Sequence, residues 1–208
     1  MTAGVAVVTG ASGGIGGAVA AEMRRRGWEV ISWSRQDGVD ASDESAVEAA
    51  AERLQGWGAL VNNAAVLIPR LLTEMSAAEW DETLAAGLRS AFLCSRAAFR
   101  RMRPGGAIVN VSSLSGVAGA EKFPRMSAYV AAKSGLAGLT EAMAVEGRAL
   151  GIRVNAVSPG SVDTPMLALS GAPKEPSLRP QEVARVVAWL ASADSEPLSG
   201  ANLRLDPR

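Results

Sequence analysis

Short apolar runs alternate along the chain with longer segments in which apolar residues recur every three or four positions. The short runs predict six strands, at 5–9, 29–33, 59–62, 107–111, 152–157 and 201–205. The longer segments predict helices at 14–26, 43–54, 80–102, 127–150 and 180–191. Strands that alternate with helices in this way predict a parallel sheet with helices on both faces. We therefore expect an α/β fold, a three-layer, doubly wound, Rossmann-like single domain over residues 1–208.

The stretch from 163 to 180 breaks this rhythm. It is rich in turn-forming residues, namely Pro165, Gly171, Pro173, Pro176 and Pro180. No second apolar core follows it, so a domain boundary is not indicated. We interpret residues 163–180 as a loop that borders the substrate.

Charge and cysteine content narrow the setting in which the protein works. The 208 residues carry 21 basic and 21 acidic side chains, so nothing favours nucleic acid or a membrane surface as a partner. Cys94 is the single cysteine and cannot form an internal disulfide. The first ten residues lack a signal-peptide pattern, and the apolar runs are too short to span a bilayer. These features predict a cytoplasmic protein.

Histidine is absent from the sequence. A Ser-His-Asp triad and a histidine-ligated metal site are therefore excluded. The acidic residues show no spacing typical of a metal site, so we expect no metal. If the protein is an enzyme, another side chain must move the proton.

A glycine-rich turn, Thr9 to Gly16, lies where the first strand becomes the first helix. Gly10 allows a tight turn, Gly14 lets the backbone approach a pyrophosphate, and Gly16 lets helix and strand pack closely. The helix N-terminus adds free N–H groups and a partial positive charge. Such a turn also occurs without a ligand, so alone it only suggests a dinucleotide site.

The end of the second strand bears on the choice of coenzyme. An NAD site usually places a carboxylate there to hold the ribose 2′-hydroxyl. This chain instead has Ser34 and Arg35, which can bind a 2′-phosphate by hydrogen bond and charge. Asp37 follows two residues later, and the less favoured alternative is that Arg35 is a solvated arginine at a strand end. We predict NADP(H), in preference to NAD(H).

Tyr129, the only tyrosine, precedes Lys133 by four residues in a predicted helix, so both lie on one face. An ammonium near a phenol should lower the pKa of the phenol and make it usable as an acid or base. Most Tyr-x-x-x-Lys pairs are inconsequential surface pairs. Here Ser113 ends one upstream strand and Pro159-Gly160 ends the next, both at the edge where a ligand of this fold lies.

These residues together resemble the short-chain dehydrogenase/reductase family, including its 3-oxoacyl-carrier-protein-reductase-like members. The resemblance runs essentially end to end. It rests on the Thr9–Gly16 turn, Asp40, Asn62-Asn63-Ala64, Ser113, Tyr129, Lys133 and Pro159-Gly160 with Val162 and Thr164. It implies hydride transfer between NADP(H) and a small carbonyl or secondary alcohol substrate.

The resemblance also implies roles for these residues. Catalysis would fall to Tyr129 as acid or base, Ser113 as holder of the substrate oxygen, and Lys133, which would also bind the nicotinamide ribose. Asp40 would contact adenine, 62–64 the adenosine ribose, and Thr164 the carboxamide. The full set expected to bind the coenzyme is Gly10, Ser12, Gly14, Ile15, Gly16, Ser34, Arg35, Asp40, Asn62, Asn63, Ala64, Tyr129, Lys133, Pro159, Gly160, Val162 and Thr164. Relatives of this kind imply a homodimer or homotetramer built on the two long helices.

Three features depart from the family pattern. Ala65 stands where the family usually has glycine, and its methyl group would crowd the coenzyme slightly. Gly87 stands where the family has an asparagine that positions a water in the proton relay; glycine instead permits a kink with a free carbonyl. The segments after Arg35 and Thr164 are short. Gly87 raises the alternative of an NADP(H)-binding sensor or pseudoenzyme, although we expect Gly87→Asn to leave turnover unchanged or faster.

Overall fold

A computed structural model describes residues 4–171 and 175–206. Its six strands form one parallel sheet in the order β2-β1-β3-β4-β5-β6. The strands are β1 (Val5–Thr9), β2 (Glu29–Trp33), β3 (Trp57–Asn62), β4 (Ala107–Val111), β5 (Arg153–Pro159) and β6 (Asn202–Leu205). All five pairings are parallel, which confirms the doubly wound α/β prediction.

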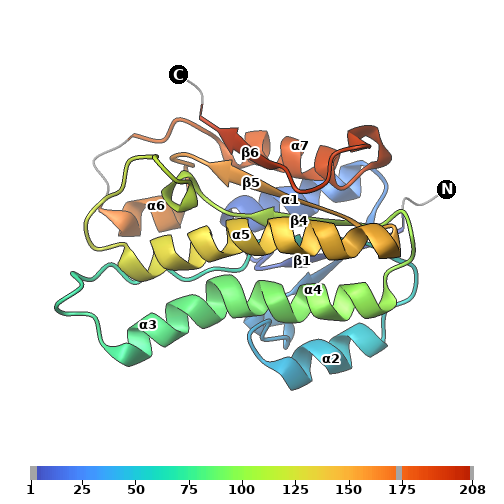
Figure 1. Cartoon of the computed structure of the whole chain (residues 1–208), viewed down its shortest axis with the longest axis horizontal. Helices are drawn as coiled ribbons and strands as arrows, with labels where there is room; N and C mark the ends of the chain where they lie inside the picture. The colour runs from blue at the N-terminus through green and yellow to red at the C-terminus, as the bar shows by residue number, and fades with distance from the viewer. Residues whose placement is uncertain (1–3, 172–174, 207–208) are drawn as a thin grey trace.

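Helices cover both faces of this sheet (Figure 1). One face packs against α1 (Gly14–Arg25) and α7 (Pro180–Leu190), which also contact each other. The other face packs against α2 (Glu44–Glu52), α4 (Ser90–Arg101) and α5 (Ser127–Leu150). Every residue of β1 and β4 is buried, as expected for parallel strands covered on both sides.

Two elements differ from the expectations of the sequence. The long helix predicted at 80–102 is divided into α3 (Ala77–Leu84), a π-helical segment η2 (Ala85–Arg89) and α4. The 163–180 stretch contains a short helix, α6 (Pro165–Ser170), which begins at a proline and ends at Gly171 in a left-handed conformation. Proline at the first helical turn loses no hydrogen bond, so it begins this helix. Residues 172–174, which include Pro173, lie outside the described residues.

The order in which strands are added to the sheet reverses at β1, because β2 lies on one side of β1 and β3 on the other. In doubly wound sheets, ligands bind at the carboxyl ends of the strands near this reversal. The glycine turn, the loop after β4, residues 163–171 and 175–180, and the end of β6 all lie at this edge (Figure 1).

Two negative findings apply to the described residues. None of their helices is long and apolar enough to cross a membrane. Among these same residues, no group of three or more Cys, Asp or Glu side chains could hold a metal ion.

Candidate active site

The glycine turn after β1 is held in place by Thr9 and Asn63. The side-chain amide of Asn63 donates to the carbonyls of Thr9 and Gly10, both at 3.1 Å. The Thr9 hydroxyl accepts from the backbone N–H groups of Asn63 (2.9 Å) and Ala64 (3.0 Å). Asn63 therefore supports the turn with its side chain, and only the neighbouring Ala64 lines a cavity.

Glycine is required at two positions of this turn. Gly10 has φ +65°, a left-handed conformation that favours glycine. A Cβ at Gly16 would lie 2.2 Å from the Gly10 carbonyl oxygen, so no other residue fits there. The first turn of α1, which follows, contains no acidic residue. Its free N–H groups and its positive end therefore suit a phosphate, as the sequence predicted.

A cavity of about 270 Å³ lies on one side of the turn. It is lined by Gly10, Ser12, Trp33, Ser34, Arg35, Gln36, Val39, Asp40, Ala41, Ser42, Ala64, Ala65, Val66, Ala86 and Ser90. Residues proposed from the sequence for the adenosine half of the coenzyme thus meet here. Asp40 accepts hydrogen bonds from the backbone N–H (2.9 Å) and hydroxyl (2.6 Å) of Ser42, which lower the pKa of its carboxyl.

Asn62, like Asn63, was predicted to contact the coenzyme but does not line this cavity. It is 4% exposed and its amide donates to Ser95 (3.0 Å) and to Asn110 (2.8 Å). Asn110 in turn donates to Thr140 at 2.8 Å. The alternation of side chains along a strand could have predicted the burial of Asn62. It lies two residues after buried Leu60 and shares its face of the sheet.

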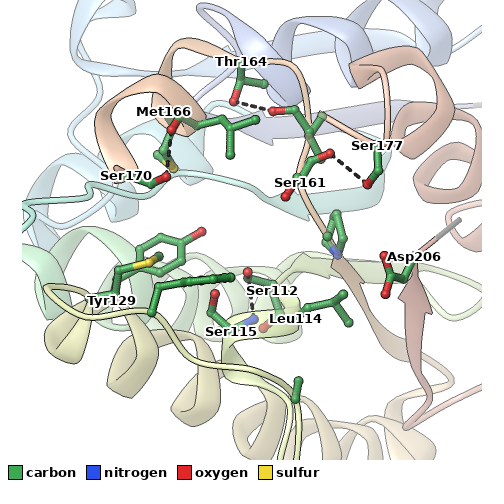
Figure 2. A pocket seen from close by; sticks show the side chains of 18 of the residues that line it. Ser112, Leu114, Ser115, Tyr129, Ser161, Thr164, Met166, Ser170, Ser177 and Asp206 are labelled. Carbon is green, nitrogen blue, oxygen red and sulfur yellow. Dashed lines mark hydrogen bonds between the residues drawn. The ribbon is translucent and has the colours of Figure 1, made fainter. Parts of the chain in front are cut away.

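A second cavity, of about 750 Å³, is lined by two of the three predicted catalytic residues, Ser113 and Tyr129, whereas Lys133 is not part of its lining. Figure 2 shows this cavity with Tyr129 at one end. Tyr129, Ser112, Leu114 and Ser115 lie along one wall, and Thr164, Met166, Ser170, Ser161 and Ser177 lie opposite. Ser113, Ile15, Pro159, Gly160 and Val162 also line it. A Cβ at Gly14 would lie 3.4 Å from the Thr164 side chain, so the 163–180 stretch begins beside the glycine turn.

The loop after β4 is docked tightly onto α5, and this fixes Ser113 beside Tyr129. The Ser112 hydroxyl donates to the Lys133 carbonyl at 3.0 Å, and Ser134 donates to the Gly116 carbonyl at 3.2 Å. A Cβ at Gly116 would lie 2.5 Å from the backbone of Lys133. Sequence reasoning missed Gly116, although a glycine three residues after a candidate catalytic serine is a signal of close approach.

Tyr129 and Lys133 lie one turn apart on α5, with the ammonium 5.6 Å from the centre of the phenol ring. Lys133 is 2% exposed and donates to the Val111 carbonyl at 2.7 Å. Burial lowers the pKa of Lys133 to about 8.

The expected lowering of the Tyr129 pKa by Lys133 is not what the structure shows. Burial raises the Tyr129 pKa to about 12, and the opposing effect comes from a hydrogen bond with Ser113. Desolvation of the phenolate outweighs that hydrogen bond and so sets the direction of the shift, while the Lys133 ammonium is bonded to the backbone of β4. Tyr129 is accordingly neutral and able to donate its proton.

Gly87 lies within the π-helical segment η2 and is buried. The sequence suggested a distortion at this position, and the segment confirms one. A Cβ at Gly87 would lie 3.3 Å from the Cβ of Ala132, the residue before Lys133. The segment η2 therefore packs closely against α5 at the position where the family pattern has asparagine.

The far end of the large cavity contains residues that sequence reasoning missed. Arg204 and Asp206, at the end of β6, and Ser161, Glu175 and Ser177 all line it. Figure 2 shows Asp206 at the opposite end from Tyr129. The carboxyl end of β6 lies at the ligand edge of the sheet, so the strand order supplied a signal for Arg204 and Asp206.

The parallel sheet and its glycine turn are those of a dinucleotide-binding α/β fold, and the chain belongs to the short-chain dehydrogenase/reductase family of oxidoreductases. Residues 37–207 match the family model described as enoyl-(acyl carrier protein) reductase. The chain is 37% identical to cis-4-hydroxycyclohexanecarboxylate dehydrogenase of Sinomonas cyclohexanicum, over 97% of this chain and 94% of the relative.

Two further relatives support the assignment. The chain is 33% identical to the 3-oxoacyl-[acyl-carrier-protein] reductase of Vibrio cholerae, over 97% of this chain and 95% of that one. A short-chain dehydrogenase from Burkholderia cenocepacia, solved in complex with NADP, matches with a TM-score of 0.88 and 28% identity over 97% of this chain and 95% of its own.

Proposed function

We propose that the protein is an NADP(H)-dependent carbonyl reductase or secondary-alcohol dehydrogenase that acts on a small molecule. The observation that carries this proposal is the meeting of Tyr129, Ser113 and buried Lys133 beside a cavity of about 750 Å³ at the glycine turn. Such an arrangement offers a proton donor, a hydroxyl for the substrate oxygen and a nearby cation.

The two cavities suit the two halves of the coenzyme. Ser12, Ser34, Arg35, Asp40 and the backbone at Ala64 would hold the adenosine half in the smaller cavity. The start of α1 would hold the pyrophosphate, with Ile15, Gly160 and Thr164 toward the nicotinamide. When bound, the coenzyme supplies or accepts the hydride.

Tyr129 is the proposed proton donor in reduction and acceptor in oxidation. In reduction, its raised pKa keeps it protonated until a developing alkoxide takes the proton; in oxidation, the phenolate form is the one that accepts the proton. The resulting phenolate would be stabilised by the Lys133 ammonium and by Ser113. Ser113 would also donate to the substrate oxygen and so hold the carbonyl carbon in place.

The cavity walls support a substrate with an apolar body. Leu114, Phe123, Met126, Met166 and Leu167 are all part of its lining. Serines and the charged residues of the far end offer hydrogen bonds to a polar group remote from the carbonyl.

We also propose a homodimer or homotetramer built on α4 and α5. These two helices lie side by side in the outer layer of one face (Figure 1). They expose apolar side chains, with Phe92 45% and Val145 63% exposed. A cytoplasmic location stays a prediction.

The test is Tyr129→Phe, assayed with NADPH and a panel of ketones, and with NADP⁺ and the matching alcohols. We expect at least a hundredfold loss of turnover, because the proton donor is removed. NADPH affinity should change less than about threefold. It can be measured by quenching of tryptophan fluorescence, because Trp33 lines the smaller cavity, in which the adenosine half would bind. Substantial residual turnover would reject Tyr129 as the donor. Wild-type protein that binds NADPH but reduces none of the panel would reject the enzyme and favour the sensor.

A further inference from the structure

The last strand of the sheet ends at the wall of the larger cavity, beside Gly160. Leu205 in β6 is paired with Pro159 in β5, and its carbonyl accepts from the backbone N–H of Gly160 at 2.8 Å. Asp206 follows Leu205 directly and lines the cavity. The pairing of β5 with β6 therefore fixes the position of Asp206 relative to Gly160.

Asp206 also lies close to the loop that contains Ser113. A Cβ at Gly160 would lie 3.2 Å from Asp206 Oδ1 and 3.3 Å from Leu114 Cδ1, so both side chains border the same point of the chain. Leu114 is the residue after Ser113 and lines the cavity too. Figure 2 shows Tyr129 at one end of the cavity and Asp206 at the other. A substrate that reacts at Tyr129 can therefore extend past Leu114 toward Asp206.

The Asp206 carboxylate has no protein partner among the residues that the structure describes. It makes no hydrogen bond and no ion pair with any of them, although Arg204 lines the same cavity two residues earlier. Both side chains are exposed. A ligand can therefore use the acceptor positions of this carboxylate without breaking a contact within the described chain.

The charges around the cavity favour a cation. The described lining contains three acidic residues and one basic residue, namely Glu121, Glu175, Asp206 and Arg204. The neighbouring Lys122 is not part of the lining, and its ammonium donates to the carbonyls of Val117 (2.7 Å) and Ala120 (3.0 Å). Because acidic groups outnumber basic ones in this wall, its potential attracts cations and repels anions.

We infer that Asp206 is a specificity-determining residue, which binds an ammonium group at the end of the substrate remote from its carbonyl or hydroxyl. The substrate class is then an amino ketone or amino alcohol. An ammonium donates up to three hydrogen bonds, and those to a carboxylate are strengthened by charge. The inference rests on the proposed function, because Tyr129 and Ser113 define the reacting end. A carboxylate or phosphate at the remote end would have only Arg204 as a charged partner and would be repelled by Asp206.

The experiment uses three 1-phenylethanols that differ only in the para substituent, which is aminomethyl, carboxamide or carboxylate. Calorimetry measures their binding to the wild type with and without NADP⁺, and NADPH formation measures their oxidation separately. The aminomethyl compound should bind about tenfold more tightly than the neutral carboxamide, and the carboxylate about tenfold more weakly. Binding tests the inference, and oxidation of the carboxamide tests the proposed function, so the two can fail independently.

Asp206→Asn removes the charge and keeps the size. The preference for the aminomethyl compound over the carboxamide should fall about tenfold in this variant, and the carboxylate should bind about threefold more tightly. Arg204→Gln should act in the opposite sense and weaken binding of the carboxylate. Asp81→Asn, on α3 outside the lining of both cavities, is the matched control and should change neither preference by more than about twofold. Circular dichroism checks that each variant is folded.

Three results would overturn the inference. One is an aminomethyl compound that binds no more tightly than the carboxamide, or does not bind. Another is an Asp206→Asn protein that keeps the wild-type preference. The third is a carboxylate compound that binds most tightly and loses affinity in Arg204→Gln, because this end of the cavity would then be an anion site. Oxidation of all three compounds with equal affinity would reject the inference and leave the proposed function standing.

Discussion

Lys133 and Arg35, the two cations proposed to act in the site, lie in opposite environments. Lys133 is 2% exposed, and its ammonium has a fixed backbone partner in the Val111 carbonyl. The side chain of Arg35 is 68% exposed and lies 3.9 Å from its carboxylate partner. Water and salt screen the exposed charge, whereas the buried charge is barely screened.

This contrast separates two tasks. The buried corner, Ser113, Tyr129 and Lys133, is the proposed site of proton transfer; it is built on a strand, a docked loop and a 24-residue helix, so its geometry is set by packing. The exposed corner, Ser34 and Arg35, is the proposed site of coenzyme selection; it lies on a three-residue turn at the end of β2 and is set by exposed charges. Changes at the buried corner should therefore have large effects, and changes at the exposed corner smaller ones.

The largest effect is expected from Lys133→Met, because it removes a buried ionisable group. The pKa of Lys133 is lowered from 10.5 to about 8, so between these values the unfolded chain binds more protons than the folded one. Stability of the wild type should therefore rise by about 2 kcal/mol from pH 7.5 to 9.5, relative to the variant. Urea unfolding at both pH values measures this difference.

Lys122→Met is the matched control, since this lysine is exposed and donates to loop carbonyls outside the core. It should follow the wild-type pH dependence. The range stops at pH 9.5, because Tyr129, with a pKa raised to about 12, acts in the opposite sense above pH 10. If the stability of Lys133→Met has the same pH dependence as that of wild type, then the Lys133 ammonium is solvated and its pKa is not lowered by burial.

Most of this buried corner could be predicted from the sequence. Helical spacing placed Tyr129 and Lys133 on one face, and strand ends placed Ser113 and Pro159-Gly160 at the same edge. Strand and helix positions followed from periodicity, and 24 residues of α5 begin and end where the pattern indicated. Residue spacing predicts these helices, because the buried face of a helix recurs with each turn.

The exposed corner and the distorted segments could not be predicted in the same way. The hydroxyls of Ser32 and Ser34 both donate to the Asp37 carboxylate. This arrangement depends on a 3-10 turn that ends at Gly38, and a single turn leaves no periodic pattern in the sequence. The direction of the Tyr129 pKa shift depends on burial. The four-residue spacing of Tyr129 and Lys133 shows that they share a helix face but does not show how deeply the phenol is buried. The short α6 escaped because its six residues are too few for a helical period to emerge.

Arg35→Ala should have an intermediate effect and tests the exposed corner directly. We expect NADPH to bind about tenfold more weakly, because a phosphate loses a charged partner in a solvent-exposed site. NADH should change less than about twofold, and added salt should shrink the NADPH effect. Fluorescence titration with both coenzymes at two salt concentrations measures this.

Arg53→Ala, on the surface at the end of α2 and outside both cavities, is the control and should leave both affinities unchanged. Equal loss for NADPH and NADH in Arg35→Ala would mean that Arg35 supports the fold of the turn and does not select the phosphate.

The smallest effect is expected from Gly87→Asn, which asks how tightly the buried corner is packed. A Cβ at Gly87 would lie 3.3 Å from Ala132, so η2 or α5 must shift by a few tenths of an ångström. We expect the free energy of unfolding to fall by about 1 kcal/mol and turnover to stay unchanged or rise. In the same assays Gly138→Asn, on the open side of α5, should stay within about 0.5 kcal/mol of wild type, since nothing lies within 4 Å of its Cβ position. If Gly87→Asn is folded but inactive, then the π-helical segment is packed around glycine. The positions of Tyr129 and Lys133 on α5 would then depend on the absence of a side chain at residue 87.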